Sequence, residues 1–177
     1  MMANRSSKIP YLIQQDNFFT EKECKSLIRK YKKLCTSDSL KTYLNYNYHD
    51  IKMTDDWGKK LLEIVNKYIK RYGGLDIIEQ WAIDNIRFKH FPKNYSFDKW
   101  HCEQTTNYPY RVFSILIYLS DHNVGTEFYH EGKTIKSKAG RAIIFPASWT
   151  HIHRGQKTNK DRYILSCYAF LRKPNEF

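Results

Sequence analysis

The sequence predicts a mostly β (α+β) domain, in which a β-sandwich or barrel is supported by helices near the N-terminus. Two stretches in the first part of the chain combine helical apolar spacing with residues that cap helices. From residue 75 onward, short β-like segments alternate with turns. Helices followed by many short strands favour this architecture. We therefore expect one domain over residues 1–177, with helical support over about 18–72 and a β core over about 80–171.

Two helices are expected before the β core. A short entry strand over 9–13 comes first, and a Thr-x-x-Glu capping box at Thr20 then begins the first helix. Thr54 caps the second helix, which ends at Gly73. The polar stretch 36–50 between them is rich in Tyr and Asn. We expect it to be a loop, and leave open whether it serves as a lid or a substrate-recognition loop.

The β core is predicted from eight short segments. Residues that favour turns, including Phe-Pro-Lys-Asn, Glu-Gly and Ala-Gly steps, separate them. We expect strands over 80–91, 100–102, 111–119, 126–130, 133–135, 142–145, 150–153 and 162–171.

Composition excludes several classes of protein. The 177 residues are 41% hydrophobic and 16% aromatic with only 7 Gly and 5 Pro, which excludes disordered and collagen-like chains. No apolar run reaches the about 18–20 residues that span a bilayer, and no secretory signal is evident, so we expect a soluble cytoplasmic protein. The cysteines form no C-x-x-C pair, so we expect free thiols at Cys24, Cys35, Cys102 and Cys167.

The charge balance suggests anionic partners. With 30 Lys and Arg against 18 Asp and Glu, the net charge is +12. Much of it lies in 22–33 and 59–71, which also have helical spacing, so we favour solvated helix faces over a nucleic-acid surface.

A candidate metal site combines His101 and Glu103 with a later histidine. On a strand, His101 and Glu103 would point the same way because successive side chains alternate. His151 and His153 are both candidates for the second imidazole. Two histidines and one carboxylate form the facial triad of non-haem Fe(II) oxygenases, although zinc hydrolases use similar ligands.

Arg162 favours the oxygenase. An oxygenase that consumes 2-oxoglutarate needs a cation at the far end of its pocket. One end of the 2-oxoglutarate chelates the iron, and a guanidinium can hold the carboxylate at the other end bidentately. A zinc hydrolase has no general need for such an arginine. Arg162 lies nine residues after His153, and this spacing also favours His153 over His151 as the ligand.

The stretch 88–170 resembles the prolyl 4-hydroxylase-like branch of the Fe(II)/2-oxoglutarate dioxygenases, in its small stand-alone bacterial or viral form. The motifs follow one another in the family's order. They are Phe91-Pro92 ten residues before an H-x-E pair, Arg-x6-Tyr-Leu from Arg111, Gly-Thr-Glu-Phe from Gly125, His153-Arg-Gly, and Arg162-Tyr.

The resemblance implies a double-stranded β-helix (jelly roll) that binds iron. It implies Fe(II) held by His101, Glu103 and His153, with 2-oxoglutarate and O₂ as co-substrates and ascorbate as reductant. Glu103 stands where the family usually has Asp, which moves the carboxylate outward by one methylene. Because a carboxylate is retained, hydroxylation is favoured over halogenation.

The resemblance also assigns residues to the co-substrate and the substrate. Arg162 would pair with the distal carboxylate of 2-oxoglutarate, with the Tyr118 hydroxyl as a second donor and Ser166 lining the same pocket. Substrate contacts are expected from Arg111, Trp100, Trp149 and Tyr168. An ordinary place in the β core is the alternative for at least one of the two tryptophans.

The implied activity is procollagen-proline 4-hydroxylase-like. A prolyl residue in a peptide or protein would be hydroxylated while 2-oxoglutarate is converted to succinate and CO₂. One alternative keeps the cofactors and acts on nucleic acid. The repair demethylases of that kind resemble one another in a second arginine six residues after the first, where this chain has Tyr168. The other alternative is a non-catalytic basic jelly-roll binding module.

Overall fold

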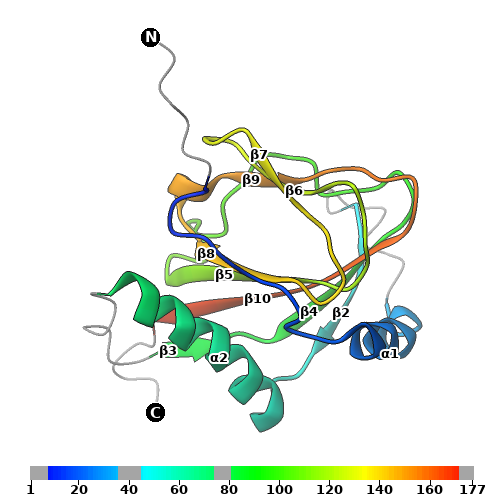
Figure 1. Ribbon diagram of the computed structural model, residues 1–177, viewed down its shortest axis with the longest axis horizontal. Coiled ribbons are helices and arrows are strands. Elements are labelled where there is room, and N and C mark those ends of the chain that lie inside the picture. The colour runs from blue at the N-terminus through cyan, green and yellow to red at the C-terminus, as the bar shows by residue number, and fades with distance from the viewer. Residues whose placement is uncertain (1–7, 36–44, 74–80, 172–177) are drawn as a thin grey trace.

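Two antiparallel sheets lie face to face, and both helices pack against the outer face of the larger one (Figure 1). The computed structural model describes residues 8–35, 45–73 and 81–171. In chain order the elements are β1 (Ile13–Gln15), α1 (Glu21–Lys32), β2 (Asn47–Ile51), α2 (Asp55–Tyr72), β3 (Trp81–Ile83), β4 (Ile86–Phe91), β5 (Arg111–Tyr118), β6 (Gly125–Phe128), β7 (Lys133–Lys136), β8 (Ala142–Pro146), a 3-10 helix (Trp149–His151), β9 (His153–Gly155) and β10 (Arg162–Leu171).

The larger sheet has the strand order β1-β8-β5-β10-β4-β2, and β3 pairs with β10 beside this path. The smaller sheet has the order β7-β6-β9, and neighbouring strands are antiparallel in both sheets. β5, β10 and β4 therefore lie side by side opposite the small sheet. This is the mostly β arrangement that the sequence predicts.

Local capping residues begin the helices as expected. Thr20 Oγ1 accepts a hydrogen bond from the Glu23 backbone N–H, and the Glu23 carboxylate accepts one from the Thr20 N–H. Thr54 caps α2, and Gly73 ends that helix with a positive φ of 61°, which favours glycine. These contacts confirm both predicted helices.

Hydrophobic side chains form two layers. The first lies between the helices and the large sheet, where α2 contributes Leu61, Ile64, Val65 and Tyr68 and β5 contributes Phe113, Ile115 and Ile117. The second lies between the sheets and includes Phe91, Leu116, Tyr118, Phe128, Phe145 and Ile164. Because β5 contributes to both layers, it is apolar on both faces.

Three predicted strands are wrong in extent or type. The segment 80–91 contains two strands that both pair with β10, because the register of pairing shifts by one residue between Ile83 and Ile86. Within 100–102 only His101 forms a bridge, to β9. Over 150–153 the chain first forms the 3-10 helix, closed by a hydrogen bond from the His151 N–H to Ser148 O, and β9 follows.

Two N-terminal predictions also change. The entry strand begins at Ile13 and pairs with β8, which places it later than 9–13. Part of the expected loop 36–50 is the edge strand β2, because that segment hydrogen-bonds along β4. Residues 36–44 lie outside the described residues, so their role as a lid or recognition loop stays a prediction.

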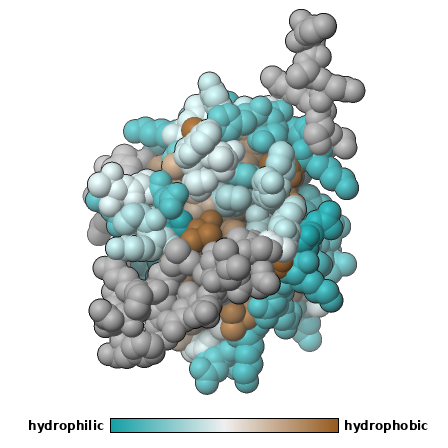
Figure 2. Space-filling model, turned by 90° about the vertical axis from the view of Figure 1, so that its left-hand side faces the viewer, coloured by the Kyte–Doolittle hydropathy of each residue, from teal (hydrophilic) through white to brown (hydrophobic). Residues whose placement is uncertain are grey.

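All four cysteines are free, as expected. No helix in the described part of the chain has the length and apolar character to cross a membrane. The face shown in Figure 2 is largely hydrophilic, with hydrophobic side chains exposed in small patches only.

Candidate metal centre and co-substrate pocket

Three side chains converge where the small sheet meets the loop before β5. His101 and His153 exchange backbone hydrogen bonds of 3.0 and 2.9 Å, which places their rings 4.4 Å apart between centroids. Glu103 Oε1 lies 3.5 Å from His101 Nε2 and 3.8 Å from His153 Nε2. One ligand atom from each residue lies within 4.8 Å of the other two. The three side chains thus present two nitrogens and one oxygen toward one point.

Backbone carbonyls fix the orientation of both imidazoles. His101 Nδ1 lies 2.9 Å from Lys99 O, and His153 Nδ1 lies 3.0 Å from His151 O. A carbonyl only accepts hydrogen bonds, so each Nδ1 carries the proton and each Nε2 has a free lone pair. Both free lone pairs are on the Glu103 side. This arrangement of donors fits a divalent transition metal ion.

The charges of these groups are those of metal ligands. Burial, and then the neighbouring His101, lower the pKa of His153 to about 4, so its imidazole is neutral at neutral pH. Burial alone would raise the pKa of Glu103, but the neighbouring His101, the positive charge of Lys89 and the neighbouring His153 hold it well below its ordinary value. Glu103 is therefore an anionic carboxylate.

Arg162 is a buried cation at the far end of the same cavity. Its side chain is 0% exposed, and burial lowers its pKa to about 10, which leaves it charged at neutral pH. Nη1 donates to Gly125 O at 3.0 Å and Nη2 to Ser96 Oγ at 2.9 Å, whereas Nε has no partner. No carboxylate among the described residues pairs with it. A buried charge without an opposite charge is costly, which suits a guanidinium that receives an anionic ligand.

An inner cavity connects this guanidinium with the three converging side chains. Arg162 and the three converging side chains all line this cavity, and its walls include Phe91, Leu116, Thr126 and Ile164. Gly155 also lines the cavity, where a Cβ atom would lie 2.9 Å from Arg162 Nη2 and 2.5 Å from Ser96 Oγ. Only glycine leaves room there for the guanidinium.

Tyr118 and Ser166 are buried near this cavity. The Tyr118 hydroxyl donates to Thr126 Oγ1 at 2.8 Å, and burial raises its pKa to about 12, so it remains a donor. Ser166 is on β10 between Ile164 and Tyr168, which by strand alternation share its face. Its hydroxyl is buried and unpartnered. The Ser166 hydroxyl is therefore available to a polar ligand, whereas the Tyr118 hydroxyl would have to release Thr126 to donate to one.

Arg111 and Tyr168 surround the other side of Glu103. Arg111 Nη1 lies 3.7 Å from Glu103 Oε2, and Nη2 lies 3.6 Å from Asp84 Oδ2. The guanidinium is sandwiched between Tyr108 and Tyr168, at 3.8 and 3.7 Å from the ring centroids. Burial raises the pKa of Tyr168 well above its ordinary value. Arg111 thus contacts the carboxylate oxygen that faces away from the histidines.

The remaining predicted residues lie farther out. Trp100 is 38% exposed and Trp149 is 69% exposed, so neither belongs to the core, and neither lines the inner cavity. Trp100 packs against Tyr129 and Arg154. The contact of Trp100 and Trp149 with substrate stays a prediction. His151 is buried elsewhere, with Nε2 2.7 Å from Pro10 O.

Lys89 is a site residue that the sequence analysis missed. It lines the inner cavity and also an outer groove, whose walls include Tyr46, Asp84, Arg87, Tyr108, Arg111 and Tyr168. The alternation of 86–91 could have indicated it, since Lys89 shares a strand face with Phe91, whose ring lies 4.9 Å from the Arg162 guanidinium.

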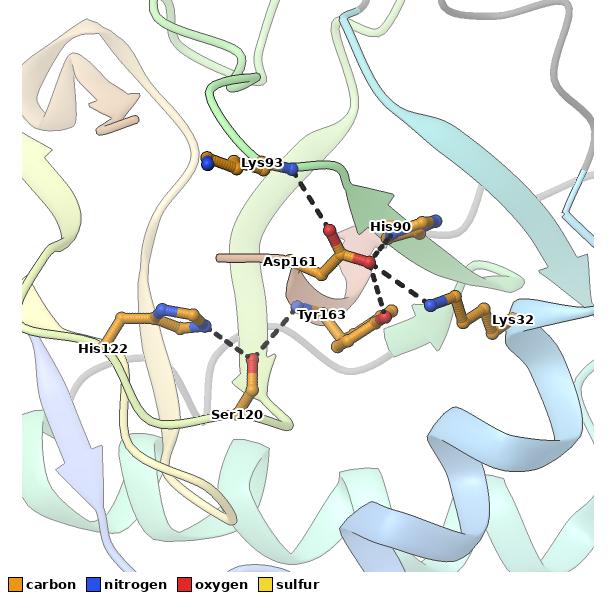
Figure 3. Close-up of polar contacts among 7 residues, drawn as sticks. All are labelled: Lys32, His90, Lys93, Ser120, His122, Asp161 and Tyr163. Carbon is orange, nitrogen blue, oxygen red and sulfur yellow. Dashed lines mark hydrogen bonds and ion pairs between the residues drawn. The ribbon is translucent and has the colours of Figure 1, made fainter. Parts of the chain in front are cut away.

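A polar network holds the start of β10, where Arg162 lies (Figure 3). The Asp161 carboxylate accepts hydrogen bonds from Lys32 of α1, from the Lys93 backbone N–H and from the Tyr163 hydroxyl, and lies 3.0 Å from His90 Nε2. The network joins α1 and the end of β4 to the residue before Arg162.

Facing antiparallel sheets, a His-Glu-His cluster and a buried arginine along one cavity are together typical of 2-oxoglutarate/Fe(II) oxygenases. Residues 87–170 match the family described as the 2OG-Fe(II) oxygenase superfamily. A search of curated proteins finds no match.

Solved structures of prolyl hydroxylases share the fold. A viral collagen prolyl hydroxylase from Paramecium bursaria Chlorella virus-1, in a 2OG complex, is 16% identical, with 90% of this chain and 95% of that chain covered and a TM-score of 0.68. A Pseudomonas putida prolyl-4-hydroxylase is 15% identical, with 92% and 93% covered and a TM-score of 0.69. A prolyl hydroxylase from Trichoplax adhaerens, in complex with a hypoxia inducible factor peptide fragment, is 15% identical, with 90% and 83% covered and a TM-score of 0.64.

The sequence match and the fold confirm the double-stranded β-helix. Residues 87–170 thus resemble the 2OG-Fe(II) oxygenase superfamily, and the chain shares its fold with solved prolyl hydroxylases.

Proposed function

We propose that this protein is a 2-oxoglutarate/Fe(II) oxygenase that hydroxylates a prolyl residue in a peptide or protein. His101, Glu103 and His153 would hold Fe(II), and Arg162 would bind the distal carboxylate of 2-oxoglutarate. The main support is a single observation: one cavity joins two oriented imidazoles and a carboxylate at one end to an unpaired, buried guanidinium at the other. Iron with 2-oxoglutarate, when bound, supplies the oxidising power to insert oxygen from O₂ into a C–H bond.

The protein's own residues would position the reactants. Arg162 offers an Nε donor and Ser166 a hydroxyl that lack partners, and the Tyr118 hydroxyl would donate to the co-substrate in place of Thr126. The apolar walls at Phe91 and Ile164 exclude water, which strengthens the interaction between the guanidinium and a carboxylate. These contacts would orient the co-substrate along the cavity.

The outer groove supports a peptide substrate. It opens beside Glu103 and has aromatic walls at Tyr46, Tyr108 and Tyr168, which suit a prolyl ring and its neighbours. The Trichoplax structure is named as a complex with a peptide fragment. Ascorbate as a reductant and a single catalytic domain are parts of the same proposal.

The test is turnover of 2-oxoglutarate to succinate with Fe(II) and ascorbate, with prolyl peptides present or absent. Mass spectrometry of the peptides should find a gain of one oxygen on proline. His101→Ala and His153→Ala should each abolish turnover, whereas His130→Ala, which alters an exposed histidine, should retain it. Full activity in the double variant His101→Ala/His153→Ala would refute the proposed metal ligands.

The net charge of +12 favours nucleic acid as the second candidate substrate. The same assay with methylated oligonucleotides in place of peptides distinguishes a nucleic-acid substrate from a prolyl substrate. Stimulated succinate release with oligonucleotides alone would select that alternative.

A further inference from the structure

Strand alternation directs Lys89 into the middle of the site. On β4, Phe88 packs in the core beneath the helices and His90 stacks on Tyr163, so these two face away from the site. Arg87, Lys89 and Phe91 share the opposite face. Phe91 lies against Arg162 at the inner end, and Arg87 lies in the outer groove. Lys89 is between them and lines both spaces.

Lys89 lacks the carboxylate partner that the other cations of the groove have. Arg87 pairs with Asp50 through two contacts of 2.7 and 2.8 Å. Arg111 pairs with Asp84 and Glu103. Among the described residues, the Lys89 side chain makes no ion pair or hydrogen bond, and its charge acts on Glu103 only at longer range.

An aromatic ring supports the lysine side chain. Its Nζ lies 5.1 Å from the centroid of the Tyr46 ring, a cation–π arrangement. The residue is half-buried, so its charge is only partly screened by water. A partly desolvated ammonium group with three donors is thus held at the junction of cavity and groove.

We propose that Lys89 binds a carboxylate at this junction, and that the substrate is an acidic prolyl peptide. The second part rests on the proposed function. A peptide lying in the groove with its prolyl ring toward the metal would bring a neighbouring Asp or Glu side chain to Lys89. The net charge of +12 would attract such peptides over longer distances. The other possible source of the carboxylate is the end of 2-oxoglutarate nearest the metal.

The test uses three variants of the full chain. Lys89→Met removes the charge but keeps a long side chain against Tyr46. Lys89→Arg restores the charge. Lys93→Met removes an exposed lysine four residues farther along and so controls for the change in net charge.

Two measurements distinguish the sources of the carboxylate. One is the affinity of the Mn(II)-loaded protein for 2-oxoglutarate, by calorimetry. The other is the KM for paired prolyl peptides that carry Glu or Gln at each position flanking the proline. We expect Lys89→Met to raise the KM of a Glu peptide about tenfold and leave its Gln partner unchanged, with recovery in Lys89→Arg.

A tenfold loss of 2-oxoglutarate affinity would instead assign the carboxylate to the co-substrate and refute the acidic peptide. If Lys89→Met behaves like Lys93→Met in both measurements, the proposal is overturned. Absence of peptide hydroxylation by the wild-type protein would refute the prolyl substrate, while the calorimetric arm would still report on Lys89.

Discussion

Arg162 is a buried guanidinium with no carboxylate beside it in the described structure, and this has an energetic consequence. Desolvating an unpaired charge destabilises the folded protein, because its hydrogen bonds to Gly125 and Ser96 replace hydration only in part. Such a residue is retained where function requires the charge. Stability and function should therefore respond in opposite directions to its removal.

We expect Arg162→Met to stabilise the ligand-free protein by about 1 kcal/mol or more, because an apolar side chain replaces a buried charge. The same variant should weaken 2-oxoglutarate binding by about two orders of magnitude, since a buried carboxylate loses its charged partner. Urea unfolding and calorimetry with the Mn(II)-loaded protein measure the two effects. Destabilisation together with unchanged affinity would contradict this account of Arg162.

Gly155 provides the space that the guanidinium occupies. A Cβ atom there would meet Ser96 Oγ at 2.5 Å and Arg162 Nη2 at 2.9 Å. Gly155→Ala should therefore displace the guanidinium and weaken 2-oxoglutarate binding tenfold to about a hundredfold. Calorimetric titration of the Mn(II)-loaded variant measures this loss.

Gly58→Ala is the matched control, because a Cβ atom there meets nothing within 4 Å and the residue lies inside α2. It should leave the affinity unchanged and stabilise the protein by about 0.5–1 kcal/mol. Equal affinities for Gly155→Ala and Gly58→Ala would exclude the proposed role of Gly155.

At the scale of elements, Asp161 joins α1 and β4 to the start of β10 (Figure 3). Asp161→Asn should destabilise the protein by about 1 kcal/mol, a modest value because the carboxylate is 37% exposed. Asp98→Asn is the control. Asp98 is equally exposed but forms an ion pair with Lys157 alone, so this variant should lose almost no stability. Chemical denaturation compares them, and equal losses would argue against a linking role for Asp161.

The helices could be predicted because the contacts that begin them are local. Thr20 and Glu23 are three residues apart, and Thr54 caps the turn that follows it. β2 could not be predicted, because its polar residues become a strand only by pairing with β4. His151 illustrates the same limit: its Nε2 contacts the carbonyl of Pro10, which is far away in the sequence.

The site was predictable in part for a related reason. Residue type and spacing indicated His101, Glu103, His153 and Arg162, and the structure brings all four to one cavity. Their expected geometry differed, since Glu103 follows a single bridge rather than lying on a strand. Lys89 resembles any other strand lysine until its partners on neighbouring strands are known.

At the scale of the whole molecule, buried histidines make stability depend on pH. Burial lowers the pKa of His90, His122, His151 and His153 below 6.5, and that of His153 to about 4. As the pH falls below 6.5, the unfolded chain binds protons that the folded chain does not. The free energy of unfolding must then decrease.

We therefore expect the metal-free protein to be less stable at pH 5.5 than at pH 7.5. Carboxylates such as Asp16 and Asp161, whose pKa values lie near 2, contribute no loss in this range. Urea unfolding in the presence of a chelator measures the difference. Equal or greater stability at pH 5.5 would be inconsistent with neutral, buried imidazoles.

The described structure has one cavity with the cluster of His101, Glu103 and His153 at one end and the Arg162 guanidinium at the other. A crystal structure of the protein grown with Mn(II) and N-oxalylglycine tests this most directly. We predict one Mn(II) ion on His101 Nε2, Glu103 and His153 Nε2, with the distal carboxylate of N-oxalylglycine on Arg162. A metal ion bound elsewhere, or a ligand that leaves Arg162 unpaired, would contradict the account.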